Sequence, residues 1–282
     1  MDRRAFLKHM GRAAVTAGLG GAVGLAHANR YAPYNYEVTE VTIPIANLPK
    51  AFDGFRIAHI SDLHAEDLPL SYLERALDEV NGLNADLIAM TGDFVSEDAG
   101  AMDDLAPLLS ELKAQHGVFA CLGNHDVWAD RDRVLKGLER HGSRVLDNEG
   151  ERVTIGRSSL YIAGVADAWN DHYDLNAALK DAPEDGPTVL LWHEPDVIEQ
   201  VSRDGRVDLQ LSGHSHAGQI KVPFFGPPVL PFLGRRYPEG RYRVGDTWLY
   251  TNRGLGVSGL PIRFNCRPEI TVLRLEPAPS ST

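Results

Sequence analysis

Two cysteines in 282 residues are too few for a scaffold built on disulfides. Long apolar runs are absent as well, which excludes a multi-span membrane protein. Positive charge is in deficit, because 28 Lys and Arg face 39 Asp and Glu and leave a formal net charge of −11. Such a chain attracts neither nucleic acid nor an anionic membrane through its overall field, so no nucleic-acid partner is expected. An anionic substrate would need bound cations that reverse the sign locally.

What is present is an ordinary globular composition, with 43% hydrophobic residues, 27 Gly and 17 Pro. The chain is long enough for one large domain with a sizeable core, and it shows neither an internal repeat nor a linker. We predict one domain over residues 29–276. The last residues, 277–282, read Pro-Ala-Pro-Ser-Ser-Thr and predict a disordered tail.

Residues 1–28 differ from the rest of the chain. Arg3 and Arg4 are adjacent, Phe-Leu-Lys follows at 6–8, a mildly apolar stretch rich in Ala and Gly runs from 13 to about 26, and Ala-His-Ala ends it. This pattern resembles a twin-arginine (Tat) export signal. It implies the Tat export machinery as a partner and a location in the periplasm or cell envelope. A signal kept as a membrane tether, with peripheral membrane contact, and a basic tail on a cytoplasmic protein are the alternatives.

The two cysteines, Cys121 and Cys266, each lie in an apolar, strand-like run. We predict buried, inert thiols, because sequence spacing does not show that the two meet. A disulfide in an oxidising compartment is the alternative.

Short apolar runs alternate with amphipathic ones between residues 55 and 213. We expect buried strands at 55–60, 86–90, 118–122, 160–165, 188–192 and 209–211. Helical spacing occurs near 70–82, 101–113, 130–140, 174–181 and 195–203. From about residue 218 the pattern changes to strands and turns, with antiparallel strands expected at 241–245, 247–251 and 269–275. The alternation predicts an α/β fold, and a second sheet built partly from the late segments would make a two-sheet sandwich flanked by helices.

Five of the apolar runs end in polar side chains that can carry chemistry. In open α/β sheets, ligand sites gather at the carboxyl ends of strands, on loops held by a rigid scaffold. These strand-end residues are Asp62 and His64, then Asp93, then Asn124, His125 and Asp126, then His193, and last His214 and His216.

Seven of these residues suit metal ions. Two Asp, one Asn and four His supply oxygen and imidazole ligands without a thiolate, which favours Mn, Fe or Zn over a structural Cys-type zinc site. Seven ligands are too many for one tetrahedral ion, but they suit two ions that share a carboxylate and lie about 3.5–4 Å apart. We therefore predict two divalent metal ions, with Mn as the first expectation and Zn or Fe as alternatives. The predicted ligands are Asp62, His64, Asp93, Asn124, His193, His214 and His216.

Taken in order, these motifs resemble the calcineurin-like metallophosphoesterase superfamily. The spacing is 31 residues from Asp62 to Asp93 and 31 again from Asp93 to Asn124. The later segments 252–256 and 261–270 resemble a bacterial branch of exported phosphodiesterases that carries Tat signals and is related to transmembrane metallophosphoesterases. The resemblance implies an α/β/β/α fold and a hydrolase acting on phosphoric esters.

The resemblance also implies a role for each residue. One ion would be held by Asp62, His64, Asp93 and His216, and the other by Asp93, Asn124, His193 and His214, with Asp93 bridging. A hydroxide between the ions would attack phosphorus. His125 would contact a phosphoryl oxygen or protonate the leaving alkoxide, and Asp126 would orient the His125 imidazole.

Departures from related families narrow the predicted substrate. The segment after Asp93 lacks the Asp-Arg-Gly typical of protein Ser/Thr phosphatases, and Ser96 stands where purple acid phosphatases place a tyrosine. We therefore expect a phosphodiesterase. The alternatives are a pyrophosphohydrolase acting on lipid-linked precursors such as UDP-diacylglucosamine, a phosphomonoesterase, and, outside the enzymes, a metal-free scaffold.

Two late segments leave further questions open. Residues 254–259 match the dinucleotide-binding pattern G-x-G-x-x-G. No helix is expected after them, so the match is weak evidence for a dinucleotide site. A glycine-rich loop near the metals, with Arg253 facing a phosphate, is our interpretation. Residues 222–234 are apolar and rich in proline, and packing under the sandwich edge is the first expectation. The alternative is an apolar lid or groove wall for a lipid-linked substrate.

Overall fold

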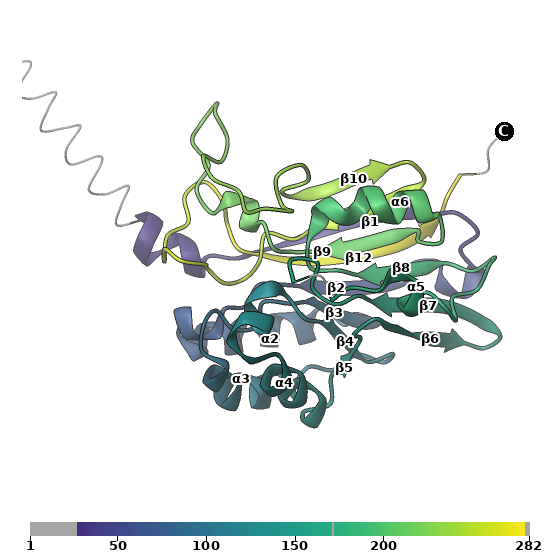
Figure 1. Ribbon diagram of the computed structural model, residues 1–282, viewed down its shortest axis with the longest axis horizontal. Helices are drawn as coiled ribbons and strands as arrows, with labels where there is room; N and C mark the ends of the chain where they lie inside the picture. Colours follow the sequence, from purple (N-terminus) through teal and green to yellow (C-terminus); the bar gives the residue numbers. More distant parts are fainter. Residues whose placement is uncertain (1–26, 171, 280–282) are drawn as a thin grey trace, which may run out of the picture.

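The computed structural model describes residues 27–170 and 172–279, and it consists of two six-stranded sheets packed face to face (Figure 1). The first sheet has the strand order β1-β12-β2-β3-β4-β5, and the second has the order β10-β11-β9-β8-β7-β6. The chain builds β2 to β5 of the first sheet, crosses to build the whole second sheet, and then returns with β12. The late segments therefore contribute to both sheets.

In the first sheet, β2 (Arg56–Ile60), β3 (Leu87–Thr91), β4 (Val118–Cys121) and β5 (Arg144–Val145) run parallel to one another. Next to β2, β12 (Glu269–Pro277) runs antiparallel, and β1 (Glu37–Ile45) pairs with β12 in parallel. Residues of β3 and β4 are all buried, as expected for strands covered on both faces. Continuous apolar runs such as 87–90 therefore form the central strands.

In the second sheet, β7 (Ser158–Gly164), β8 (Thr188–Leu191), β9 (Leu209–Ser212) and β11 (Thr247–Thr251) run parallel. Antiparallel strands close both edges: β6 (Glu149–Ile155) pairs with β7, and β10 (Gly240–Val244) pairs with β11.

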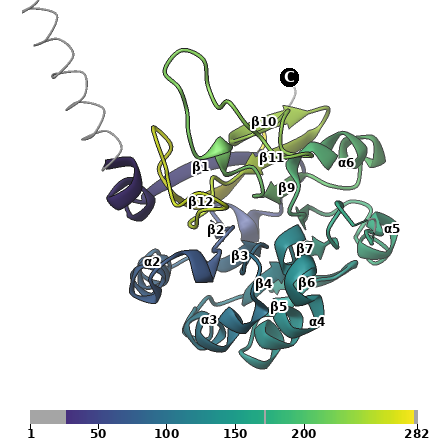
Figure 2. The same cartoon turned by 60° about the vertical axis from the view of Figure 1, so that its left-hand side comes forward.

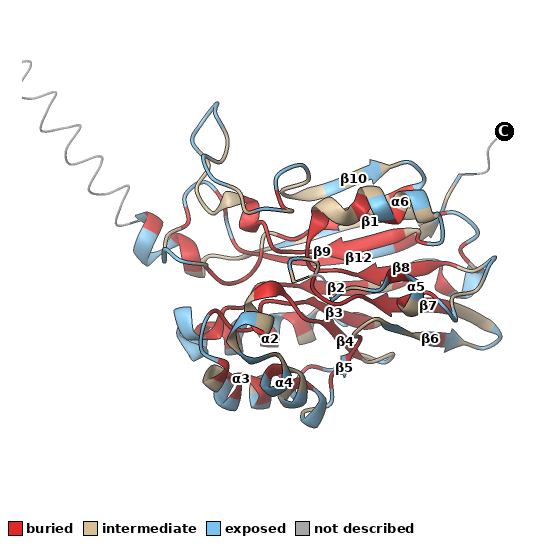
Figure 3. Ribbon diagram, in the orientation of Figure 1, coloured by how far each residue is buried: buried red, intermediate tan, exposed pale blue. Residues whose placement is uncertain are grey.

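Helices cover the outer face of each sheet and complete a four-layer structure (Figure 2). The helices α2 (Leu70–Gly82), α3 (Met102–Leu109) and α4 (Asn124–Arg140) pack on the first sheet, and α5 (Leu175–Ala178) and α6 (Ile198–Asp204) pack on the second. The interface between the sheets is filled by aliphatic and aromatic side chains, and buried residues concentrate in the two middle layers (Figure 3). Short 3₁₀ turns lie at Ala32–Tyr34, Lys50–Phe52, Ala65–Asp67, Ala99–Ala101, Pro195–Val197 and His216–Gly218.

The predicted α/β/β/α sandwich is therefore confirmed, and every predicted strand and helix is present. The bounds of α2 and β11 agree with the prediction, and those of the other predicted elements differ. Helix α4 is interrupted at Asp130, whose backbone is not helical, so the helix predicted near 130–140 is its second part, and the first part, from Asn124, was not predicted. Three strands, β1, β5 and β6, were not predicted. The predicted Tat-type segment 1–28 lies outside the described residues except for 27 and 28. Of the predicted tail, Pro277 belongs to β12, and residues 280–282 lie outside the described part.

Both cysteines are buried and unpaired, as predicted. Burial raises the pKa of the Cys121 thiol well above its usual value, which keeps it unreactive. Among residues 27–170 and 172–279, no helix combines the length and the apolar character needed to cross a bilayer.

Candidate metal centre

The predicted ligands meet where the carboxyl ends of parallel strands from both sheets come together. Asp62 and His64 follow β2, Asp93 follows β3, and Asn124 opens α4 after β4. From the other sheet, His193 follows β8, and His214 and His216 follow β9. The backbone N–H of His214 donates to both carboxylate oxygens of Asp62, at 3.0 and 3.1 Å, so the two sheets are joined at the site itself.

The backbone at these positions is strained. Positive φ angles between 45° and 68° occur at five of the seven predicted ligands, namely Asp62, His64, Asp93, His214 and His216. Residues with a side chain rarely adopt this left-handed conformation, and it persists only where the surrounding structure imposes it. The strain therefore marks the strand ends as a site whose side-chain directions are fixed.

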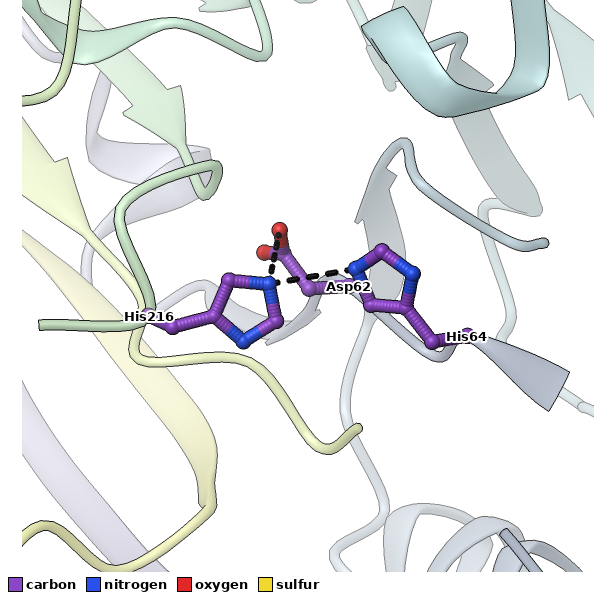
Figure 4. A group of neighbouring side chains, drawn as sticks. All are labelled: Asp62, His64 and His216. Atoms are coloured by element: carbon purple, nitrogen blue, oxygen red, sulfur yellow. Dashed lines mark hydrogen bonds and ion pairs between the residues drawn. The ribbon is translucent and has the colours of Figure 1, made fainter. Parts of the chain in front are cut away.

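The first group of potential ligands consists of Asp62, His64 and His216, all buried. His216 Nε2 lies 3.1 Å from His64 Nε2 and 3.2 Å from Asp62 Oδ1. Figure 4 shows the carboxylate and the two imidazole rings turned toward one another. Three donor atoms thus surround one point, as ligands of a single ion do.

The second group consists of Asp93, His193 and His214, which are also buried. Asp93 Oδ2 lies 3.1 Å from His193 Nε2 and 3.7 Å from His64 Nε2 of the first group. This oxygen therefore lies between the two groups, where a shared carboxylate is expected.

Hydrogen bonds on the far side of three imidazoles leave one ring nitrogen of each available to a metal. His193 Nδ1 lies 2.5 Å from the Thr91 carbonyl oxygen, and His214 Nε2 lies 2.7 Å from that of Phe232. A carbonyl only accepts, so these nitrogens carry the proton. His64 Nδ1 lies 2.8 Å from Ser96 Oγ, and because that hydroxyl donates to Asp67, it accepts from His64.

The chemistry of the donor set fits two divalent ions. The Oδ1 atom of Asn124 is buried without a hydrogen-bond partner, although a buried amide oxygen is normally satisfied. Burial lowers the pKa of His64 to about 3 and that of His214 to about 4, so both imidazoles are neutral donors at physiological pH. For Asp93, burial opposes ionisation, but the adjacent His193 holds the pKa of this carboxyl well below its usual value.

Asp126 does not orient His125, contrary to the sequence-based expectation. Its carboxylate accepts the backbone N–H groups of Asp93, Phe94, Val95 and Gly123 at 2.8–3.2 Å. Through these four hydrogen bonds, the Asp126 carboxylate fixes the loop that carries Asp93. The His125 ring instead contacts the carbonyl oxygen of Ser96 through Nδ1, at 2.9 Å.

The glycine-rich loop does lie beside the metal ligands, but Arg253 does not face the site. Its guanidinium pairs with Glu269 at 2.9 Å and with Glu37 at 2.6 Å. A Cβ atom on Gly254 would lie 2.7 Å from the Cβ of Asp62, and the Gly256 N–H donates to the Asp62 carbonyl at 2.6 Å. The loop thus supports Asp62. No helix begins in residues 254–268, so the dinucleotide pattern lacks its structural context.

A pocket of about 470 Å³ opens over both ligand groups, with Asp93, Asn124, His125, His214 and His216 in its wall. Most of the remaining wall is apolar and comes from helix α4 and three loops. These wall residues include Trp128, Trp169, Ile220, Pro228, Val229, Pro231 and Leu260. Trp128 stacks edge-on against both His125 and Trp169, with ring centroids 4.9 and 5.4 Å apart.

Sequence reasoning missed both tryptophans. The only signal in the sequence was their position, because Trp128 comes two residues after Asp126 and Trp169 four residues after the strand predicted at 160–165. The expectation that residues 222–234 pack under the sandwich edge is wrong, because Phe224, Phe225, Val229 and Phe232 are exposed.

Comparison with known proteins agrees with this geometry. A family model described as calcineurin-like phosphoesterase matches residues 55–218, which contain every predicted ligand. The chain belongs to this family. It is a hydrolase acting on phosphoric esters, and its two buried ligand groups form a candidate dinuclear divalent metal centre.

Relatives with similar sequences include metallophosphoesterase YkuE of Bacillus subtilis, 37% identical over 98% of each chain. Phosphodiesterase YaeI of Escherichia coli is 34% identical over 78% of this chain and 82% of its own. A transmembrane protein with a metallophosphoesterase domain from Danio rerio is 31% identical over 86% of this chain, which spans 58% of that relative.

Proposed function

We propose that this calcineurin-like phosphoesterase is a phosphodiesterase that works through a dinuclear metal centre. The observation that carries the proposal is the position of Asp93 Oδ2, within 3.7 Å of a histidine from each ligand group. Bound there, two divalent ions would supply Lewis acidity and a bridging hydroxide for attack on phosphorus. Mn is the first candidate, and Zn and Fe are the alternatives.

The protein's own residues would position the ester. His125 lies in the pocket wall, and its Nδ1 is held by the Ser96 carbonyl, so Nε2 remains to contact a phosphoryl oxygen or to pass a proton to the leaving alkoxide. Asp126 acts at a distance, because it fixes the loop of Asp93 through backbone N–H groups. It is a positioning residue.

Two observations support a diester over a monoester. The pocket continues past the ligand groups to an apolar wall that would receive a second substituent on phosphorus. The relative YaeI is named a phosphodiesterase. The apolar wall also keeps a lipid-linked pyrophosphate, such as a UDP-diacylglucosamine-like precursor, as the second candidate.

We also propose that residues 1–28 direct export by the Tat machinery to the periplasm or cell envelope. The support is the sequence pattern of adjacent Arg3 and Arg4 before an uncharged stretch that ends in Ala-His-Ala. Cell fractionation of the full chain and of an Arg3→Lys/Arg4→Lys variant tests the proposal. Retention of the variant in the cytoplasm is expected, and equal export of both proteins would contradict it.

The test of the activity compares bis-p-nitrophenyl phosphate with p-nitrophenyl phosphate, using chelated protein and protein reloaded with Mn, Zn or Fe. We expect metal-dependent cleavage of the diester and weak cleavage of the monoester. Asp93→Asn removes the shared carboxylate, so diester turnover should fall by about 10³-fold or more. Asp78→Asn, an exposed site on α2, is the matched control.

Other outcomes would redirect the proposal. A preference for the monoester would indicate a phosphomonoesterase. Two tightly bound ions without turnover of either ester would favour the pyrophosphate candidate. No bound metal and no turnover would indicate a metal-free scaffold.

A further inference from the structure

Two phenylalanines stand at the tip of a hairpin beside the metal pocket. The hairpin is closed by the Val222 N–H donating to the Gly226 carbonyl and by the Gly226 N–H donating to the Val222 carbonyl, both at 2.9 Å. At its tip, the exposed fractions of Phe224 and Phe225 are 104% and 87%. The loop that carries the hairpin projects from the body of the molecule (Figure 2).

This tip destabilises the isolated molecule, because it combines a strained backbone with exposed apolar side chains. Phe224 has φ 69°, a left-handed conformation that glycine or asparagine adopts readily and a bulky residue does not. Full exposure means that no packing within the chain compensates for the strain. Single exposed apolar residues are ordinary, but two adjacent aromatic side chains on a closed turn indicate a contact outside the chain.

The charge around the tip differs from that of the whole protein. The two loops on this face, residues 217–238 and 254–268, contain no Asp or Glu, whereas the protein has a net charge of −11. Of their five basic residues, Arg263 is buried, and Lys221, Arg236 and Arg267 pair with Glu239, Glu199 and Glu37 from outside the two loops. Arg235 makes no salt bridge within the described residues. An exposed apolar tip on loops that carry no acidic residue of their own suits the interfacial region of a phospholipid bilayer, where Phe side chains bury their rings.

The tip is continuous with the pocket. Pro228, Val229 and Pro231 of the same loop line the pocket, and Leu260 of the second loop, 61% exposed, lies in its wall. The two loops are joined by the Gln219 side chain, which donates to the Ser258 carbonyl at 2.9 Å. An object that covers the tip would therefore also border the mouth of the metal pocket.

The described part of the chain begins on this same face. The Arg263 N–H in the second loop donates to the Ala28 carbonyl at 2.9 Å. Residues 27 and 28 therefore lie against the second loop, and the uncharged sequence 13–26 precedes them in the chain. A chain attached to a membrane through that sequence would present this face to the bilayer.

We infer that Phe224 and Phe225 insert into the surface of a phospholipid bilayer and hold the metal pocket at the boundary between lipid and water. The site then takes phosphoesters that carry an acyl chain, with the chain lying along the wall formed by Val229 and Leu260. The docking stands on the exposed surface alone, whereas the substrate class rests on the phosphodiesterase function proposed above.

Binding to vesicles of phosphatidylcholine and phosphatidylglycerol at 3:1 tests the docking, with the full chain in each case. The double variant Phe224→Asn/Phe225→Ser places asparagine in the left-handed position and removes no internal contact, so it is expected to fold. Its partition coefficient should fall at least about tenfold, because two fully exposed aromatic side chains leave the interface. The matched control Val38→Thr/Leu70→Ser makes similar changes at exposed apolar sites outside the two loops and should bind as the wild type does.

Equal vesicle binding by the double variant and the wild type would overturn the inference. So would a change from dimer to monomer in sedimentation with vesicle binding unaltered, since the tip would then contact a second copy of the chain. Loss of binding in the control as well would also count against a specific role of the tip.

The substrate class is tested with a chromogenic pair, bis-p-nitrophenyl phosphate in solution and hexadecyl p-nitrophenyl phosphate in the same vesicles. In the double variant, kcat/KM should stay within about twofold for the first ester and fall at least about fivefold for the second. Equal losses on both esters would overturn the inference. If neither protein cleaves either ester while the variant still loses vesicle binding, the proposed function fails and the docking stands.

Discussion

The floor and the rim of the pocket are built in opposite ways. On the floor, the seven predicted ligands are all buried, with exposed fractions of at most 5%, and their outer atoms bond to neighbouring backbone and side chains. At the rim, apolar side chains of residues 222–234 and 258–260 face solvent. Because the ligand side chains on the floor are buried and hydrogen-bonded, their orientations are fixed, as a metal centre requires. The rim has no such constraint, so it is the part that can adapt to a substrate.

The largest difference between floor and rim is expected in the free energy of unfolding. It is measured with Gly254→Ala on the floor and its match, Gly259→Ala at the rim. Both glycines have nearly the same left-handed φ, 74° and 72°, so the backbone strain added by alanine is equal. A Cβ on Gly254 would lie 2.7 Å from the Asp62 Cβ, whereas a Cβ on Gly259 meets nothing within 4 Å. Gly254→Ala should lower the free energy of unfolding by about 3 kcal/mol or more, and Gly259→Ala by about 1 kcal/mol.

Thermal unfolding and metal titration of the two variants measure the difference. Because the added methyl group pushes on Asp62, Gly254→Ala should also weaken binding of one ion more than of the other. Equal destabilisation by the two substitutions would mean that the floor yields as easily as the rim.

A smaller effect, on metal affinity, is expected from a residue that holds one of the ligands by a hydrogen bond. Ser96 Oγ accepts the Nδ1–H of His64 and donates to Asp67, which keeps His64 Nε2 free of a proton. Ser96→Ala removes this acceptor, so affinity for the ion at Asp62, His64 and His216 should fall by about 10–100-fold. Ser71→Ala on the exposed surface of α2 is the control.

Isothermal titration with Mn²⁺ separates the two ions if their affinities differ. The ion at Asp93, His193 and His214 should be affected less, since Ser96 contacts none of these side chains. An equal loss at both sites would indicate a general loosening of the floor, and unchanged affinity would show that His64 needs no support.

The floor was predictable from sequence because the carboxyl ends of parallel strands lie at the same edge of a sheet. Five apolar runs, each followed by Asp, Asn or His, predicted both the sandwich and the ligands that the structure gathers. The wrong predictions concerned residues whose partners lie in distant segments of the chain. Asp126 was assigned to its neighbour His125, but its partners include the backbone of residues 93–95. Arg253 was assigned to a phosphate, but it pairs with Glu37, 216 positions away.

The rim was not predictable for a different reason. Apolar residues such as Phe224 and Val229 normally indicate a buried segment, and nothing local in the sequence distinguishes a covered loop from an exposed one. Strand β1 was missed because exposed and half-buried residues alternate over Glu37–Thr42 at the edge of the first sheet, so Glu and Thr interrupt its apolar residues and no continuous apolar run forms. Trp128 and Trp169 lie 41 positions apart and become one surface only through the fold.

The smallest effect is expected from that tryptophan pair, which lies between floor and rim. Trp169 contacts Trp128, His214 and Phe232 edge-on, with centroids 5.4–5.8 Å apart, and is still 37% exposed. Trp169→Ala should raise KM for bis-p-nitrophenyl phosphate by about 3–10-fold with little change in kcat, because an aromatic wall contributes binding and no reacting group. Trp169→Phe should restore most of the loss. A fall in kcat at unchanged KM would place Trp169 with the floor, where it would act by holding His214 in position.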